Sequence, residues 1–125
     1  MKSPLKKEKD KLWKLCREIS FKRHGNHCYT CPARNLNGSN RQLGHFISSS
    51  ICSTALRYDL DNLRPQCFGC NIWRSGNWLA FEAHLKIDGI DVEALKRRNE
   101  ETKAGMYRIE WYRAKIAEYE QLEAL

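Results

Sequence analysis

The sequence predicts a small α+β fold in which two short extended segments lie between helices. Helical patterns occupy both ends of the 125-residue chain, and each extended segment adjoins a pair of cysteines. A chain of this length forms one domain, with a modest core and a helical extension at most. Any metal held by the cysteines is therefore expected to matter for the stability of the fold.

Three helices are predicted from apolar spacing and from residues typical of helix ends. Residues 5–22 carry apolar side chains opposite a lysine-rich face, and Ser3-Pro4 is a favourable helix start. Residues 78–85 predict a second helix that ends near Asp88-Gly89. A third helix is expected to begin at Asp91, a residue type that caps helix N-termini.

A longer helix is predicted from about residue 102 to the end of the chain. It carries an apolar stripe at a spacing of three to four residues, formed by Ile109, Tyr112, Ile116 and Tyr119. Such a stripe belongs either to the core of the same chain or to the interface of a homodimer. The sequence leaves both alternatives open.

The extended segments lie between the helical ends of the chain. Residues 41–48 are expected to form a strand, in which Gly44 permits close backbone contact. Residues 56–66 suggest a second short extended segment. Residues 35–40, NLNGSN, are rich in turn formers and predict an exposed loop.

Six cysteines are distributed in a way that favours metal binding over disulfides. Two C-x2-C pairs stand 35 residues apart, while Cys16 and Cys52 are isolated. The first residues show no apolar run typical of a signal peptide, so a reducing compartment is expected, where paired cysteines more often bind metal. The pattern predicts one structural zinc, with all four positions filled by Cys28, Cys31, Cys67 and Cys70.

The formal net charge of +7 is concentrated in the first 75 residues, which surround the cysteine pairs. This distribution is typical of proteins that bind polyanions, although a solubilising surface has the same composition. Candidate contacts to nucleic acid are Lys6, Lys7, Lys9, Lys11, Arg41 and Arg74. No segment approaches the roughly 20 apolar residues that a membrane span requires, so a cytosolic protein without a membrane partner is expected.

Three polar residues are not explained by a structural zinc. His45 and Asn62 lie between the cysteine pairs, and Asn71 directly follows the last cysteine. Hydrolysis of a phosphodiester needs a base and a hard cation, and a neutral histidine suits the first role. An amide oxygen suits Mg²⁺, which retains several waters and needs few protein ligands.

These motifs resemble the HNH, or ββα-metal (His-Me finger), endonucleases, and most closely the phage NinG/Rap-type recombination endonucleases. The resemblance rests on CYTC, GHFISSS and YDLDNLRPQCFGCN and covers roughly residues 25–97. It implies a zinc-stabilised, treble-clef-like ββα-metal core with flanking N- and C-terminal helices. The expected division is a basic helix (1–24), a nuclease core (25–88) and a helical extension (89–125) that offers a dimer interface.

The resemblance also implies roles for single residues. His45 would be the general base, Asn62 would hold the loop that orients it, and Asn71 would bind the catalytic Mg²⁺ or Mn²⁺. Gly44 departs from the family, many of whose members carry a second metal ligand there. Candidates for that ligand are Asp59, Asp61 and His84, or water.

The implied function is a Mg²⁺-dependent endonuclease that cleaves branched recombination intermediates, namely Holliday junctions or D-loops. It would be encoded by a phage and act in the cytoplasm of a bacterial host. Symmetric cleavage of both strands needs two active sites, which fits a homodimer. Two alternatives remain, an HNH nuclease that nicks ordinary duplex DNA and a zinc-stabilised DNA-binding module without catalysis.

Overall fold

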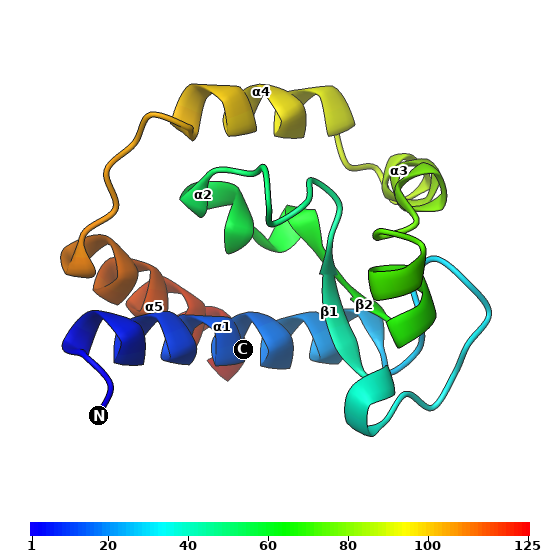
Figure 1. Ribbon diagram of the computed structural model, residues 1–125, viewed down its shortest axis with the longest axis horizontal. Coiled ribbons are helices and arrows are strands. Elements are labelled where there is room, and N and C mark those ends of the chain that lie inside the picture. Colours follow the sequence, from blue (N-terminus) through cyan, green and yellow to red (C-terminus); the bar gives the residue numbers. More distant parts are fainter.

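Helices α1 and α5 lie against each other, α1 packs on strand β2 of a small sheet, and α4 lies against α2 and α3 at the opposite edge of the molecule, as Figure 1 shows. The computed structural model describes residues 1–125. The elements in chain order are α1 (Pro4–His24), β1 (Gln42–His45), α2 (Thr54–Arg57), β2 (Leu63–Gln66), α3 (Trp78–Ile87), α4 (Val92–Thr102) and α5 (Ile109–Ala124). The α+β class expected from the sequence is confirmed.

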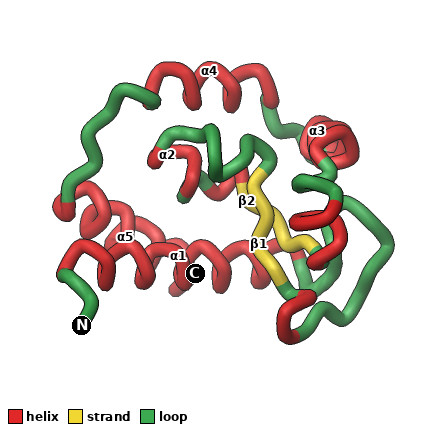
Figure 2. Tube along the Cα trace, viewed as in Figure 1, coloured by secondary structure: helices red, strands yellow, loops and turns green.

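Strands β1 and β2 form an antiparallel pair, and helices and loops surround it (Figure 2). Gly44 pairs with Arg64 and His45 with Leu63. Gly44 is buried, and a Cβ atom at this position would overlap the side-chain oxygen of Gln66. The close contact predicted for this glycine is therefore present, and it explains why no larger residue stands before His45.

The predicted helix starts are confirmed by capping hydrogen bonds. Ser3 Oγ accepts from the backbone N–H of Lys6 at 3.1 Å, and Pro4 occupies the first turn of α1. Asp91 Oδ1 accepts from the backbone N–H of Ala94 at 3.0 Å and so opens α4. Each cap satisfies a donor that the helix itself leaves without a partner.

Two predicted boundaries were wrong. The segment 56–66 is extended only at β2, because Ser53 caps the short helix α2 with an Oγ that accepts from Leu56 N at 3.1 Å. The last helix begins at Ile109 rather than near residue 102, because α4 continues to Thr102 and residues 103–108 form a connecting loop.

The apolar stripe of α5 belongs to the core of this chain. Tyr112, Ile116 and Tyr119 are buried against α1, where they contact a cluster that includes Leu12 and Ile19. Burial within the chain accounts for the stripe, so the stripe no longer argues for a homodimer. The N- and C-terminal helices share one core with the sheet, while the predicted division into three units stays a prediction.

None of the helices is at once long enough and apolar enough to cross a membrane.

Candidate functional site

The four paired cysteines converge at one end of the sheet. The sulfur atoms of Cys28, Cys31, Cys67 and Cys70 all lie within 4.8 Å of one another, and those of Cys31 and Cys67 are 3.6 Å apart. A tetrahedral zinc with Zn–S bonds of about 2.3 Å holds its sulfurs about 3.8 Å apart. The cluster therefore fits a zinc ion with little movement of the chain.

Neighbouring donors point at these sulfur atoms. The backbone N–H of Ala33 donates to Cys31 Sγ at 3.5 Å, and Asn77 Nδ2 donates to Cys70 Sγ at 3.6 Å. Burial raises the pKa of the Cys70 thiol, but side-chain hydrogen bonds with Thr30, Asn77 and the neighbouring cysteines outweigh it and bring that pKa to about 6. Donors of this kind stabilise thiolates, which are the form that binds zinc.

His45 lies at the end of β1 and is held from two sides. Its ring stacks on Trp13 of α1, with ring centroids 5.4 Å apart and the planes 7° from parallel. Its Nε2 lies 3.0 Å from the carbonyl oxygen of Arg57. A carbonyl oxygen only accepts, so Nε2 carries the proton and Nδ1 is left as the basic nitrogen. Burial lowers the pKa of His45 to about 4, which keeps the ring neutral at pH 7.

Asn62 is fully buried and holds the loop that follows β1. Its Oδ1 accepts from Ile47 N at 2.7 Å, and its Nδ2 donates to Ile47 O at 3.1 Å and to Leu56 O at 3.0 Å. The Leu56 carbonyl stands one residue before the Arg57 carbonyl that holds His45. The contacts fit the positioning role expected of Asn62.

Asn71 lies in a short π-helical turn, Gly69–Trp73, between β2 and α3. Its Nδ2 donates to Gln42 Oε1 at 2.7 Å, an orientation that leaves the amide oxygen Oδ1 available to another partner. Asn71 and His45 line the same pocket, of about 280 Å³. The other lining residues are Leu43, Ser48, Ser49, Ile72, Ser75 and Gly76. The structure thus brings together two of the three predicted catalytic residues.

A second, basic pocket of about 380 Å³ lies beside His45. Lys6 and Lys9 from α1 and Arg57 line it, and so does Asp10, whose carboxylate pairs with Lys6 at 2.7 Å. Two of the predicted nucleic-acid contacts therefore stand next to the predicted base.

The other four predicted contacts do not line either pocket. Lys7 is exposed on α1, and Lys11 forms an ion pair with Glu120 of α5 at 3.7 Å. Arg41 lies over the ring of Phe21 at 3.7 Å. Arg74 Nη1 donates to Cys70 Sγ at 3.5 Å, so this side chain reaches the cysteine cluster. A role of these four residues in binding nucleic acid stays a prediction.

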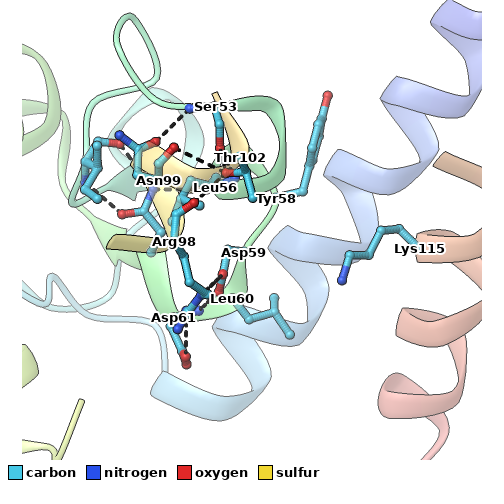
Figure 3. Close-up of polar contacts among 12 residues, drawn as sticks. Ser53, Leu56, Tyr58, Asp59, Leu60, Asp61, Arg98, Asn99, Thr102 and Lys115 are labelled. Carbon is cyan, nitrogen blue, oxygen red and sulfur yellow. Dashed lines mark hydrogen bonds and ion pairs between the residues drawn. The ribbon is translucent and has the colours of Figure 1, made fainter. Parts of the chain in front are cut away.

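The candidates for a second catalytic-metal ligand lie elsewhere. Asp59 and Asp61 pair with Arg98 of α4, with N–O distances of 3.0 and 3.4 Å, as Figure 3 shows. Both carboxylates line a separate pocket between α4 and α5. His84 Nδ1 lies 2.6 Å from the Tyr29 carbonyl oxygen. The structure therefore does not bring any of these three residues to the pocket of His45 and Asn71.

Comparison with known proteins gives one result. A family described as bacteriophage lambda NinG protein matches residues 3–124. The chain belongs to the NinG family. No curated protein and no solved structure matches it. Because the match extends from α1 to α5, family membership includes both terminal helices, on which the motifs between residues 25 and 97 gave little information.

Three residues of the site were missed by sequence reasoning. Trp13 stacks on His45, the backbone carbonyl of Arg57 accepts a hydrogen bond from His45, and Gln42 orients Asn71. A backbone carbonyl leaves no signal in a sequence, because every residue carries one. Trp13 gave only the weak signal of a tryptophan in a lysine-rich helix.

Proposed function

We propose that this NinG-family chain is a metal-dependent DNA endonuclease of the HNH type that cleaves branched intermediates of phage recombination. The observation that carries the proposal is the shared pocket of His45 and Asn71, which combines a neutral imidazole with a free amide oxygen. The adjacent basic pocket supplies Lys6, Lys9 and Arg57 for phosphate groups. A plain zinc-binding module has no need of this combination.

In this mechanism, His45 Nδ1 takes a proton from the attacking water. The imidazolium that forms keeps its Nε2–H donated to the Arg57 carbonyl, which stabilises the positive charge and fixes the direction of the ring. Trp13 limits rotation of the ring from the side, and Asn62 holds the surrounding loop. The base is therefore oriented before DNA arrives, which avoids a cost in the transition state.

Asn71 Oδ1 would hold a divalent cation of the hard, oxygen-preferring class. When bound, Mg²⁺ or Mn²⁺ would stabilise the negative charge that develops on the phosphate. The residues that line the pocket include no carboxylate, so most of the ligands would be water and phosphate oxygens. This neutral set of donors fits a cation that binds together with DNA rather than before it.

Zinc at the four cysteines would be structural, since all four tetrahedral positions are taken by sulfur. The cysteine pairs flank the segment that carries His45 and Asn62, and Cys70 immediately precedes Asn71. The ion would thereby fix the turn of Asn71 relative to β1. Paired incision by a dimer on DNA, in the cytoplasm of the phage's host, stays an expectation from the family resemblance.

The function is tested by incubation of the zinc-loaded protein with a labelled four-way junction and with a linear duplex of the same sequences. With Mg²⁺, we expect faster cleavage of the junction than of the duplex, and no cleavage of either without added Mg²⁺. Equal rates on both DNAs would favour a nicking enzyme for ordinary duplex. Binding of both without any cleavage, with Mg²⁺ or Mn²⁺, would favour a non-catalytic module.

A further inference from the structure

Another pocket, which we call the third pocket of the site after those of His45 and Asn71 and of Lys6 and Lys9, lies beside the pocket of His45 and Asn71 and has a different character. It is enclosed by the loop after β1, the start of α3 and one face of α4, and its volume is about 440 Å³. Ser48 and Ser75 line both pockets, so the two are adjacent. The volume lies within the roughly 300–1,000 Å³ typical of small-molecule sites.

One wall of this third pocket is apolar and accessible. Phe46 and Ile47 form part of the lining, and so do Ile51 and Trp78, whose side chains are 65% and 55% exposed. Exposed aromatic side chains of this kind provide platforms on which nucleobases stack. A wall of this composition suits a flat, uncharged ring.

One polar group of the third pocket lacks a partner within the chain. Asn99 of α4 is only 5% exposed, and its Oδ1 accepts from the backbone N–H of Ser53 at 2.8 Å, as drawn in Figure 3. This bond fixes the orientation of the amide, so Nδ2 is left as a donor on a side chain that lines the pocket. Asn99 Nδ2 is not among the fully buried atoms without a partner, so it is accessible from the pocket, and the edge of a nucleobase offers carbonyl oxygens and ring nitrogens as acceptors for it.

The rim of the third pocket carries charge suited to a phosphate backbone. Two lysines line the pocket: Lys96, on α4, and Lys103, in the loop after α4. Glu100, also on the rim, pairs with Lys103 at 3.0 Å, and Lys96 pairs with Glu82 at 3.1 Å and with Glu93 at 3.6 Å. The lysine side chains of these ion pairs are exposed, and such surface pairs contribute little individually, so the lysines are free to exchange partners.

We infer that the third pocket binds an unpaired nucleobase of the DNA whose strand enters the pocket of His45 and Asn71. The inference rests on the proposed function and specifies its substrate, because unpaired bases occur where a duplex branches or opens. Stacking on Trp78, donation from Asn99 Nδ2 and the shared wall at Ser48 and Ser75 together favour a base over an apolar peptide. Preference for branched DNA then arises from this pocket.

The test compares three labelled duplexes by fluorescence anisotropy, with no divalent cation added. One duplex is fully paired, one contains a run of unpaired thymidines, and one carries abasic sites at the same unpaired positions. We expect the protein to bind unpaired thymidines on the order of 10-fold more tightly than the abasic equivalent, the effect of base stacking on an aromatic side chain. This comparison needs no variant protein, and equal affinities would refute the inference.

Two tryptophan variants locate the effect. Trp78→Ala should lose the preference for thymidines over abasic sites, while its affinity for the paired duplex stays unchanged. The matched control is Trp73→Ala, since Trp73 is 80% exposed but packs on Phe68 and does not line the pocket. The inference fails if Trp78→Ala keeps the preference, or if Trp73→Ala loses it equally.

The result is separate from that of the cleavage test. A protein that cuts junctions but binds thymidines and abasic sites alike would refute only the base-binding pocket. A protein with the preference but without cleavage would refute only the nuclease.

Discussion

Replacing His45 with alanine is expected to lower the rate of junction cleavage by about 10²- to 10⁴-fold, the usual contribution of a general base. The variant should keep its fold, its zinc and its affinity for DNA, because His45 lies at the end of β1 and its side chain contacts only the Trp13 ring and one backbone carbonyl among the interactions that hold it. A melting curve, a binding titration and a cleavage time course on one preparation measure all three properties.

His84→Ala is the matched control for this variant. His84 also places a ring nitrogen near a backbone carbonyl, that of Tyr29, but it lies outside the pocket of His45 and Asn71. We expect it to cleave at the native rate. If His45→Ala melts early and loses binding and cleavage together, His45 is a packing residue and the assignment as base is wrong.

The pH dependence of wild-type cleavage gives a second measure of the same residue. Burial lowers the pKa of His45 to about 4, whereas an ordinary histidine titrates near 6.5. The basic form therefore persists below pH 6.5, and kcat/KM should hold from pH 7 to about pH 5 before it falls. In the unfolded chain His45 has the ordinary pKa, so it binds a proton at a higher pH than in the folded protein. The free energy of unfolding is therefore unaffected by His45 above about pH 6.5, and it decreases as the pH falls from 6.5 toward 4. Circular dichroism at each pH separates unfolding from loss of the base.

Removal of zinc is expected to have the second large effect, on folding rather than on chemistry. Zinc binding by thiolates supplies on the order of 10 kcal/mol in small domains, which exceeds the stability of many domains of this size. Cys70→Ser removes a buried ligand and should abolish zinc binding and cooperative unfolding. Metal analysis of freshly purified protein and a thermal melt measure the two effects.

Cys52→Ser is the control, because this partly buried cysteine lies outside the cluster. It should retain one zinc per chain and melt close to the wild type. Purified wild-type protein without zinc, with its four clustered cysteines joined as disulfides, would contradict the structural role of the metal.

Local patterns in the sequence were enough to predict the elements that depend on local chemistry. The caps at Ser3 and Asp91 and the end of α3 before Gly89 follow from single residues, and the structure confirms them. The cysteine cluster was also predictable, because each C-x2-C pair forms within one turn. Only the convergence of the two pairs depends on the fold.

Features that depend on long-range packing were less predictable. An apolar stripe like that of α5 has the same sequence pattern in a core helix and in a dimer interface. Only the packing of α5 against α1 shows that this stripe belongs to the core. Asp59 and Asp61 are close to Asn62 in sequence, but both form ion pairs with Arg98 of α4, away from the pocket of His45 and Asn71. The pocket of His45 and Asn71 depends on Gln42 and on the Arg57 carbonyl, whose roles appear only in three dimensions.

The central claim is that a DNA strand is cut in the pocket of His45 and Asn71, with a cation held by Asn71. The most direct test of this claim is the cleavage rate measured as a function of Mg²⁺ concentration. Asn71→Ala should need more Mg²⁺ for half-maximal cleavage than the wild type, because one oxygen ligand is lost while water and phosphate remain. Asn37→Ala, at an exposed loop position, should match the wild type. A cleavage rate and Mg²⁺ dependence in Asn71→Ala identical to those of the wild type would contradict the claim.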